Sequence, residues 1–487
     1  MEDILSSIES FCAWRAKQNI SIKESVEILA SRILEIEKSV HAFSHFDKKA
    51  FIEKAELDNN LSKNGILSGI PIAIKSNICV KGELTDCSSR ILEGFRPPYN
   101  ATVVEKLLAH GALIASGANM DEFAFGSSCE TSYFGPTKNP WDITRIPGGS
   151  SGGSAASVSS GEVLAALGSD TGGSIRQPAA MCGVVGLKPT YGRVSRYGLI
   201  AFASSLDQIG PITRNVADSA CILEIISGYD NRDSTSVNMP VPRYTKMLGA
   251  DIKGVKIGLP SEYFEGGIDE DVLESVRASI ELFKKLGAEI VNISLPNTKY
   301  ALSCYYIIGP SEASSNLARY DGAHYGYRAG DADDIISMYT KTRNEGFGTE
   351  AKRRILIGTY ALSAGYYDAY YLKAQKVRTK IADDFKEAFK SCDCILTPTA
   401  PSTAFKIGEK MNDPLKMYLS DIFTIPANLA GIPSMSIPCG FSRESLPIGL
   451  QIMAKAFDEE TIIRVADAFE RHTEYSQKYS LGRENGK

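Results

Sequence analysis

Residues 148–161, GGSSGGSAASVSSG, decide whether the chain folds as one unit or as two parts joined by a linker. By composition, this stretch rich in glycine and serine is typical of a flexible linker. It leads directly into the apolar residues 163–167, however, and a second cluster, DTGGS, follows at 170–174. A linker rarely sits inside a continuous apolar pattern. We therefore expect both clusters to lie within one folded domain, where glycine lets the backbone approach other groups closely.

Strand-like and helix-like segments alternate around this stretch. Residues 66–75, ILSGIPIAIK, are short, apolar and β-branched, and they predict a buried strand that reaches Lys75. Residues 102–108 predict a helix, and the apolar residues 112–115 after Gly111 predict another strand. This alternation favours an α/β fold built on a sheet.

The same alternation continues toward both ends of the chain. Ser21 and Glu24 have the spacing of a capping box, and apolar residues then recur at helical intervals, so residues 1–40 are predicted to be helical. In the second half, the patterns predict strands at 255–259, 289–295 and 394–396, and helices at 272–286 and 349–390. No internal repeat and no clear linker is visible.

The composition of the 487 residues is that of an ordinary folded protein. The 53 Lys and Arg residues against 58 Asp and Glu residues give a net charge of −5, and 43% of the residues are hydrophobic, which argues against disorder. The mild acidity argues against a nucleic-acid-binding surface over the whole chain. Because no signal peptide is visible and no apolar run approaches the roughly 18 residues of a membrane span, we expect a cytoplasmic protein.

The cysteines and the nucleotide-binding motifs limit the possible cofactors. The ten cysteines are scattered and form no CxxC pair, so we expect reduced, mostly buried thiols and no zinc site. Neither a GxxxxGK[ST] loop nor a dinucleotide-binding fingerprint occurs. We therefore expect this chain to bind no metal and no nucleotide cofactor of its own.

The DTGGS cluster suits hydrolysis by a serine nucleophile. Its backbone amides can converge on a carbonyl oxygen that Ser174 attacks, although a single GGS is more often a plain tight turn. The chain has only five histidines, and none lies in a glycine-serine cluster, so a base other than histidine is considered. Burial would lower the pKa of Lys75 and make it a base, whereas a lysine at a strand end can also extend into water.

A competing motif is present in the first cluster. Residues 149–153, GSSGG, also fit the G-x-S-x-G elbow of α/β-hydrolases, with Ser151 as the nucleophile. That alternative requires a downstream histidine, His324 or His472, and usually a loop of the HGGG type, which is absent from the sequence.

Three blocks, taken together, are more specific than any single motif. GIPIAIKSN at 69–77, PGGSSGGSAA at 147–156 and GSDTGGSIRQPA at 168–179 resemble the amidase signature family. The resemblance implies an α/β fold: one large domain with a central mixed, twisted sheet covered by helices on both faces. It places a helical segment at 1–60 on the core and the amidase domain at 61–487, with the signature core at about 69–215 and elements for substrate and partners at about 300–440.

The resemblance also implies the roles of individual residues. Ser174 corresponds to the acyl-forming nucleophile, Ser150 to a bridging serine held by a cis peptide after Gly149, and Lys75 to the base of a Ser-cisSer-Lys triad. A hydroxyl can relay a proton because it both donates and accepts. Ser76 departs from the family pattern, in which aspartate often follows the lysine. The amides of the oxyanion hole would be those of Thr171, Gly172, Gly173 and Ser174, in a loop held by a pair between Asp170 and Arg176.

Four blocks outside the signature extend the resemblance over nearly the whole chain. NMDEFAFGSS at 119–128, EASSNLARYDG at 312–322, the segment 345–371 and PANLAGIPSMSIPCG at 426–440 resemble the amidase subunits of tRNA-dependent amidotransferases. This implies a glutaminase that supplies ammonia to a partner subunit, which converts Glu-tRNA(Gln) to Gln-tRNA(Gln) with ATP and Mg²⁺. The implied assembly is a heterotrimer with B and C subunits, in which the tRNA is bound mainly by the partner.

The glutamine-binding residues are also expectations from this resemblance. Arg354 would bind the α-carboxylate, Asp421 the α-amine, and Tyr305 or its neighbour Tyr306 would line the pocket. Spacing alone would place Arg354 and Asp421 on a solvated helix face. Two other functions stay open: a stand-alone amidase of a small carboxamide, and a non-catalytic scaffold, which would not need the lysine and the two serines.

Overall fold

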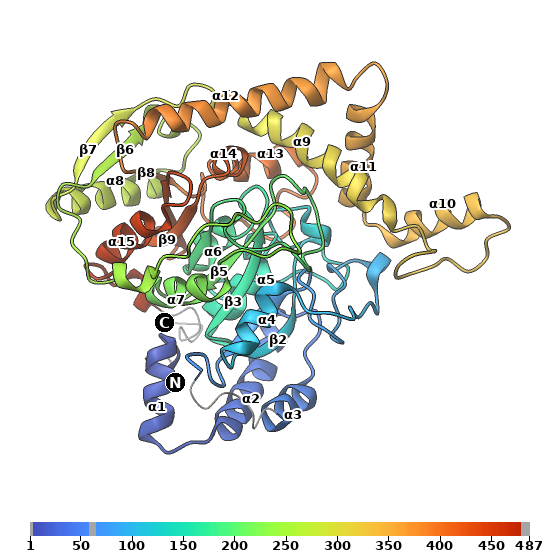
Figure 1. The fold of residues 1–487 in the computed structure, drawn as a ribbon, viewed down its shortest axis with the longest axis horizontal. Coiled ribbons are helices and arrows are strands. Elements are labelled where there is room, and N and C mark those ends of the chain that lie inside the picture. The colour runs from blue at the N-terminus through green and yellow to red at the C-terminus, as the bar shows by residue number, and fades with distance from the viewer. Residues whose placement is uncertain (1–2, 58–64, 479–487) are drawn as a thin grey trace.

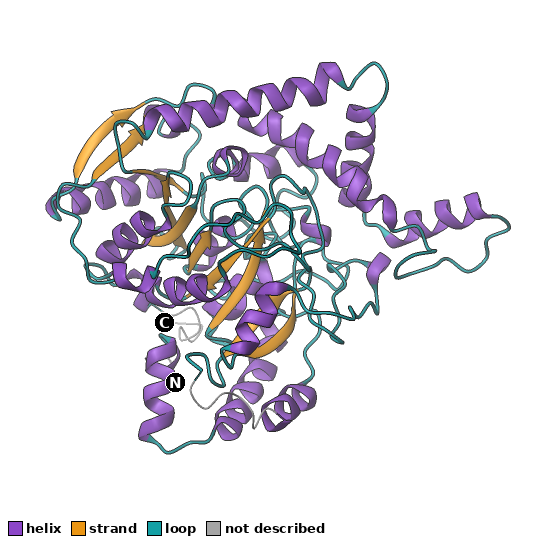
Figure 2. Ribbon diagram, in the orientation of Figure 1, coloured by secondary structure: helices purple, strands orange, loops and turns teal. Residues whose placement is uncertain are grey.

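A ten-stranded sheet runs through the centre of the molecule, with helices packed around it (Figures 1 and 2). The computed structural model describes residues 3–57 and 65–478. The strands are, in their order across the sheet, β2 (Leu113–Ala118), β1 (Pro71–Lys75), β3 (Ala165–Asp170), β5 (Gln208–Thr213), β4 (Val185–Lys188), β9 (Ser434–Phe441), β10 (Pro447–Ala454), β8 (Cys394–Pro398), β6 (Lys256–Pro260) and β7 (Glu289–Ile293).

The sheet is mixed. β1 is parallel to both β2 and β3, and β6 is parallel to both β7 and β8. The pairs between β3, β5, β4, β9, β10 and β8 are antiparallel. The fold class predicted from the sequence, an α/β fold with a mixed sheet, is therefore confirmed.

The α-helices of the described residues come from the whole length of the chain. They are α1 (Ile8–Lys17), α2 (Ile22–Val40), α3 (Lys48–Leu57), α4 (Thr102–Ala109), α5 (Gly152–Ser159), α6 (Arg176–Cys182), α7 (Val216–Ile226), α8 (Glu270–Lys285), α9 (Ala301–Asn316), α10 (Ile335–Gly346), α11 (Thr349–Leu362), α12 (Lys373–Ala388), α13 (Pro414–Tyr418), α14 (Ile425–Ala430) and α15 (Glu459–Glu470).

Alternating side chains of the central strands bury both faces of the sheet. In β1, Ile72 and Ile74 belong to a core shared with α4, α7 and α15, whereas Ala73 belongs to a core shared with α2, α5 and α6. The same alternation separates Leu167 from Ala166 in β3. Because neighbouring strand residues point to opposite faces, helices are required on both sides, as predicted.

The N-terminal helices pack against this core. In α2 the capping box is formed as predicted: Ser21 Oγ accepts from the Glu24 amide, and the Glu24 side chain accepts from the Ser21 amide. Val26, Ala30 and Ile33 of α2 share a buried cluster with residues of α5 and of β1. The domain boundary predicted between residues 60 and 61 lies outside the described residues.

One predicted strand is shorter than expected. The sequence 66–75 predicted a strand along its whole length, but β1 begins only at Pro71. Residues before it form tight turns, in which the Ile70 amide donates to Leu67 O, and Gly69 has φ +72°. That left-handed backbone conformation favours glycine and does not continue a strand.

A further core lies among helices from the second half of the chain. It contains Tyr305 of α9, Ala351 of α11, Phe385 of α12 and Ile425 of α14. In Figure 1, α12 runs along the top of the molecule, α9 lies below it, and α10 extends away from the body as an arm. This core brings together α9, α11 and α14, which are far apart in sequence.

The cysteines agree with the reduced, mostly buried thiols expected from the sequence. All ten cysteines are free thiols, and eight of them are buried. Among the described helices, none combines the length and the apolar composition that crossing a membrane would require.

Candidate active site

Lys75 ends β1, and its side chain is completely buried. Its Nζ lies 2.7 Å from Ser150 Oγ, 2.9 Å from Ser151 Oγ and 2.9 Å from Ser169 Oγ. Burial lowers the pKa of Lys75 to about 7, while the nearby charge of Asp121 partly opposes this shift. Burial therefore favours the neutral amine, which has a lone pair that can accept a proton.

The peptide bond between Gly149 and Ser150 is cis, as the family resemblance implied. The Gly149 amide donates to Gln177 Oε1 at 2.9 Å, and a Cβ at Gly149 would lie 2.2 Å from Asp121 Oδ2. Only glycine fits at this position. Ser150 is itself completely buried, directly before the first turn of α5.

Ser174 lies beside these residues but is joined to them through the backbone. Its carbonyl oxygen accepts a hydrogen bond from the Ser151 amide at 3.1 Å, and its side chain is 8% exposed. With the described residues, the Ser174 hydroxyl makes no side-chain hydrogen bond. The structure thus joins Lys75 to Ser150 directly, while the contact between the Ser150 and Ser174 hydroxyls is not formed.

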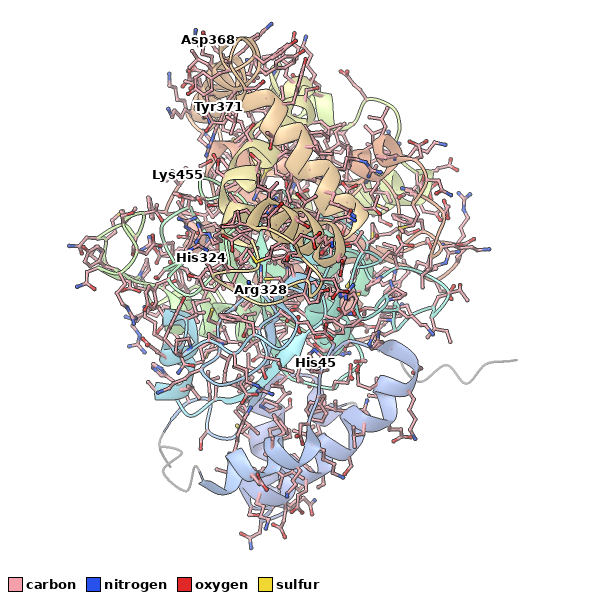
Figure 3. The ribbon with its side chains drawn as sticks, turned by 90° about the vertical axis from the view of Figure 1, so that its right-hand side faces the viewer. His45, His324, Arg328, Asp368, Tyr371 and Lys455 are labelled. Carbon is pink, nitrogen blue, oxygen red and sulfur yellow. The ribbon has the colours of Figure 1, made fainter. Side chains whose placement is uncertain are left out.

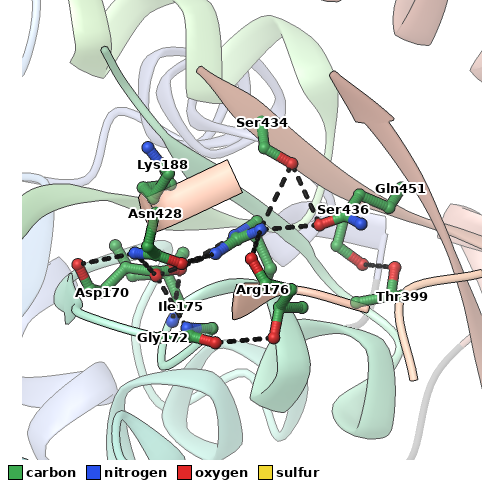
Figure 4. A network of polar contacts seen from close by, with 12 residues as sticks. Asp170, Gly172, Ile175, Arg176, Lys188, Thr399, Asn428, Ser434, Ser436 and Gln451 are labelled. Carbon is green, nitrogen blue, oxygen red and sulfur yellow. Dashed lines mark hydrogen bonds and ion pairs between the residues drawn. The ribbon is translucent and has the colours of Figure 1, made fainter. Parts of the chain in front are cut away.

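The loop before Ser174 is fixed by a buried ion pair. The Arg176 guanidinium donates to both carboxylate oxygens of Asp170, each at 3.0 Å (Figure 4). Burial alone would raise the pKa of Asp170, but the Arg176 charge lowers it to about 2. Asn428 Nδ2 also donates to Asp170 Oδ1, at 2.8 Å. Asp170 therefore stays ionised and holds the loop, as expected for the pair.

The predicted oxyanion amides differ in their availability. The Gly173 amide donates to Asp170 Oδ1 at 2.9 Å and is therefore occupied in this structure. Within the described part of the chain, the amides of Gly172 and Ser174 make no hydrogen bond and can serve a ligand. Thr171 lies in the same loop, with its hydroxyl donating to Asp207 Oδ1 at 2.7 Å.

Ser169 contacts the lysine, although no motif identified it as a site residue. Ser169 accepts from Lys75 Nζ and also from Asn77 Nδ2 at 2.9 Å, and its position within the third signature block was the only available signal. Ser76, which departs from the family pattern, donates to the buried carboxylate of Asp86 at 2.8 Å and points away from the lysine. His45 contacts the other oxygen of Asp86, at 2.8 Å.

Arg354 lies on α11 between two aromatic rings. Its guanidinium carbon lies 4.5 Å from the ring centre of Tyr306 and 4.6 Å from that of Tyr418. Glu350 Oε1, one turn earlier, accepts from Arg354 Nε at 2.7 Å and from the Tyr418 hydroxyl at 3.0 Å. Arg354 is 3% exposed, so it does not lie on a solvated helix face.

Asp421 ends a short 3₁₀ helix, η9 (Leu419–Asp421), and is also buried. Ser127 Oγ donates to its Oδ2, whereas its Oδ1 is buried without a hydrogen-bond partner in the described structure. Burial raises the pKa of Asp421 to about 7, while the Ser127 hydrogen bond and the Arg354 charge lower it. An unpartnered carboxylate oxygen near a guanidinium suits a ligand that carries both an ammonium and a carboxylate.

Tyr305 connects this pocket to the nucleophile loop. A Cβ at Gly172 would lie 2.8 Å from the Tyr305 hydroxyl oxygen, so the tyrosine packs directly on the glycine. Burial raises the pKa of Tyr305 well above its usual range. The hydroxyl therefore stays protonated and can only act as a neutral hydrogen-bonding group.

A cavity of about 390 Å³ opens beside Arg354. Its lining includes Glu122, Phe125, Glu350, Arg353, Arg354 and Lys410. Ser174 and Asp421 are not part of that lining. The cavity thus leads from the surface to the Arg354 guanidinium.

In the described segments, no group of three or more His, Cys, Asp or Glu residues is arranged so that it could hold a metal ion.

The α/β-hydrolase alternative finds no support in the positions of its histidines. Ser151 Oγ contacts Lys75 and Ser169, not a histidine. His324 is paired with Asp321 at 2.8 Å and is 68% exposed, in the segment that leads to α10 (Figure 3). His472 Nδ1 contacts the backbone oxygen of Ala468 at 2.7 Å.

Comparison with known proteins identifies relatives along almost the entire chain. The Amidase family model matches residues 24–463. The glutamyl-tRNA(Gln) amidotransferase A-subunit of Persephonella marina is 58% identical over 467 residues, which cover 95% of this chain and 96% of the relative. That of Geobacillus kaustophilus is 58% identical over 466 residues, with the same coverage. The crystal structure of the corresponding Thermotoga maritima protein is 47% identical, covers 94% of each chain and superimposes with a TM-score of 0.79.

Proposed function

The chain belongs to the amidase family, and from this premise we propose that it is the glutamine-hydrolysing subunit of a glutamyl-tRNA(Gln) amidotransferase. The observation that carries the proposal is the buried lysine beside a serine hydroxyl, with Lys75 Nζ 2.7 Å from Ser150 Oγ. Relatives that carry the name of this subunit, 58% identical over 95% of the chain, support the substrate and the assembly.

The first chemical step is the attack of Ser174 on glutamine. Ser174 Oγ attacks the side-chain amide carbon while its proton passes to Ser150 Oγ, and the Ser150 proton passes to neutral Lys75. A hydroxyl can take part in both transfers because it donates and accepts at once. The protonated lysine then returns a proton through Ser150 to the leaving nitrogen, and ammonia departs from a glutamyl ester on Ser174.

The second step is hydrolysis of this ester. Water takes the place of ammonia, loses a proton to Lys75 through the Ser150 hydroxyl and attacks the ester carbon. Lys75 then returns a proton through Ser150 to Ser174 Oγ as the ester bond breaks, which releases glutamate and restores the Ser174 hydroxyl. In both steps the negative oxygen of the tetrahedral intermediate would lie against the Gly172 and Ser174 amides, with Thr171 beside them. Such preorganised donors usually supply a large part of the rate acceleration.

Recognition of glutamine would use both ends of the amino acid. Arg354 presents guanidinium nitrogens for the α-carboxylate, because only its Nε is used by Glu350. Asp421 Oδ1, which has no partner among the described residues, would accept from the α-ammonium. Tyr305 would then pack on the side chain next to Gly172. This binding mode would direct the side-chain amide of a five-carbon amino acid toward the nucleophile.

The relatives are named as subunits, so the chain is expected to work within a complex. We assign the partners as B and C subunits of a heterotrimer in the cytoplasm. In this assignment the partner subunit holds ATP, Mg²⁺ and most of the Glu-tRNA(Gln), and it uses the ammonia released here. The chain itself binds no cofactor in this scheme.

Replacement of the nucleophile tests the proposal directly. Ser174→Ala in the assembled complex should abolish glutamine-dependent formation of Gln-tRNA(Gln) but leave formation from added ammonia. Intact-mass measurement of the wild-type complex with glutamine should detect a glutamyl adduct on Ser174 that the variant lacks. Loss of both activities in a correctly folded Ser174→Ala complex would contradict the assignment.

A stand-alone amidase of a small carboxamide would use the same three residues. The two functions differ in their dependence on partners. Glutamine turnover that increases when the B and C subunits are added supports the amidotransferase, whereas cleavage of diverse amides by the isolated chain, without preference for glutamine, supports the stand-alone enzyme.

A further inference from the structure

The peptide unit between Gly172 and Gly173 is held at both of its ends. The Gly172 carbonyl oxygen accepts a hydrogen bond from Thr424 Oγ1 at 2.7 Å. The N–H on the other side of the same peptide, that of Gly173, donates to Asp170 Oδ1 at 2.9 Å. Because a peptide is planar, these two contacts together fix its orientation.

The position of this peptide restrains the neighbouring amides, because the peptides on both sides are bonded to it. The Gly172 and Ser174 amides flank it, and they are the free donors of the predicted oxyanion hole. A displacement of the clamped peptide would shift both of them, because each belongs to a peptide that shares a Cα atom with it. Gly173 has φ +140°, and glycine adopts many backbone conformations with similar ease. Contacts with other residues are therefore needed to hold the loop in this conformation.

The two clamping groups belong to one closed ring of hydrogen bonds. Arg176 donates to Asp170 through Nε and Nη2 and to the Thr424 carbonyl oxygen through Nη1, at 3.0 Å (Figure 4 shows the Asp170–Arg176 part of the ring). The ring passes from Thr424 through the Gly172–Gly173 peptide, Asp170 and Arg176 back to Thr424. Its side chains are completely buried, so water cannot replace a missing contact.

The use of the Thr424 hydroxyl is unusual for its position. Thr424 is the N-cap of α14, where a threonine hydroxyl commonly accepts from an amide of its own helix. Here it makes no such capping bond. Its oxygen lies 2.7 Å from Gly172 O and 3.1 Å from Asp421 O, so the shorter of its two contacts is with the loop. The fit is tight, since a Cβ at Gly173 would lie 2.2 Å from Thr424 Oγ1.

We propose that Thr424 is a positioning residue that orients the oxyanion loop through the Gly172 carbonyl and links this loop to the turn that carries Asp421. The Thr424 amide donates to the Asp421 carbonyl oxygen at 3.1 Å, so the group expected to bind the substrate amine lies on the same turn. The inference rests on the proposed function, because it assigns a role within the same hydrolysis.

The test compares Thr424→Val, which removes the hydroxyl, with Thr424→Ser, which keeps it. Thr399→Val is the matched control, since Thr399 is also completely buried and its hydroxyl bonds to Ser436 Oγ at 2.9 Å away from the loop. In the assembled complex, Thr424→Val should lower kcat for glutamine about 10-fold or more with little change in KM, as expected when oxyanion donors are misdirected. Thr424→Ser should restore most of kcat. Thr399→Val should leave kcat unchanged, although it should lower the Tm about as much as Thr424→Val does.

A second readout separates this inference from the choice of substrate. The rate at which a fluorophosphonate probe labels Ser174 depends on the nucleophile and the oxyanion loop, but not on glutamine recognition. Slower labelling of Thr424→Val than of the wild-type protein would support the inference. If the wild-type complex is labelled but does not hydrolyse glutamine, the proposed function is overturned while the inference stands. Unchanged kcat and labelling in Thr424→Val would overturn the inference alone. A wild-type complex that neither hydrolyses glutamine nor reacts with the probe would overturn both.

Discussion

The basicity of Lys75 is set by hydroxyl groups and burial, not by an ion pair. Three serine oxygens lie within 2.9 Å of its Nζ, and none of them carries a charge. A carboxylate in direct contact would stabilise the ammonium form and raise the pKa. The departure at Ser76 is compatible with this design, because that side chain is directed at Asp86 instead.

Glutamine hydrolysis should depend on pH through two groups. Burial lowers the pKa of Lys75 to about 7 and raises that of Asp421 to about 7. The reaction needs a neutral lysine and an ionised aspartate, so acid inactivates through both groups and activity increases as pH rises through 7. We expect kcat/KM to fall more steeply below pH 7 than kcat, because bound substrate keeps Asp421 ionised.

Steady-state kinetics over the range from about pH 5.5 to about pH 9 would check this, with Asp421→Asn to separate the two groups. That variant should have a raised KM and keep only the pH dependence of Lys75. Activity that decreases as pH rises through 7 would contradict a lysine base, whose pKa is about 7.

Glu350 should determine how well Arg354 binds the substrate carboxylate. Its Oε1 holds Arg354 Nε at 2.7 Å, and its other oxygen contacts Arg353. Glu350→Gln keeps the size but weakens this contact, so we expect KM for glutamine to rise about 10-fold, equivalent to about 1.4 kcal/mol, with a smaller change in kcat. Glu387→Gln, which alters an exposed pair with Lys390, is the control. Equal KM values in the two variants would exclude this role for Glu350.

Motifs identify some residues of the site and necessarily miss others. Lys75, Ser150 and Ser174 lie in three specific blocks, so the sequence predicts them together, and the structure places Lys75 against Ser150. Glu350 and Thr424 are ordinary residues whose partners become apparent only in the fold, as with Thr424 and Gly172, 252 residues apart. No local pattern encodes such a contact.

At the level of elements, hydrophobic periodicity was sufficient where a segment is regular. It predicted α2 and α8, whose apolar residues recur at helical intervals, and most of the short apolar strand β6. It was wrong about residues 66–70, because an apolar turn before β1 resembles a strand in composition. It also predicted long helices over 349–390 without locating the turn at 363–367 that separates α11 from α12, or the π-helical turn η8 (Asp368–Leu372) that leads into α12.

Helix α5 should be sensitive to any side chain at Gly153. A Cβ there would lie 2.2 Å from Ala42 O and 2.5 Å from the backbone of Asn119, so the helix touches two other segments directly. We expect Gly153→Ala to lower the free energy of unfolding by about 2–3 kcal/mol through overpacking. Chemical denaturation would measure this, with Gly330→Ala as the control because nothing lies within 4 Å of a Cβ at Gly330. Equal stability of the two variants would show that α5 can move.

At the scale of the whole molecule, a half-buried carboxyl group, that of Glu37, and a completely buried one, that of Glu162, join the N-terminal helices to the core. Glu37 of α2 accepts from the Ala42 amide at 2.5 Å, and Glu162 lies between α5 and β3, where it accepts from Ser160 Oγ at 2.7 Å. Arg32 of α2 donates to Gly161 O nearby, at 2.9 Å. Burial raises the pKa of both Glu37 and Glu162, and the charge of Glu37 raises that of Glu162 further. The pair therefore favours a shared proton.

This pair predicts how stability depends on pH. The usual glutamate pKa is 4.5, so the unfolded chain loses the Glu162 proton above that pH while the folded chain keeps it. The stability that the protonated group contributes is present below pH 4.5 and is lost as pH rises through the folded pKa. Glu162→Gln imitates the protonated carboxyl at every pH, so it should avoid this loss.

We expect Glu162→Gln to match wild type near about pH 4.5 and to exceed its stability by about 1 kcal/mol or more at about pH 8, since one pKa unit corresponds to about 1.4 kcal/mol. Thermal denaturation across this pH range would measure the difference, with Glu281→Gln as the control because Glu281 is exposed and paired with Lys284. Parallel curves for wild type and Glu162→Gln would mean that the pair is ionised in the folded chain. A difference that grows with pH would show that the contact between the N-terminal helices and the core depends on a bound proton.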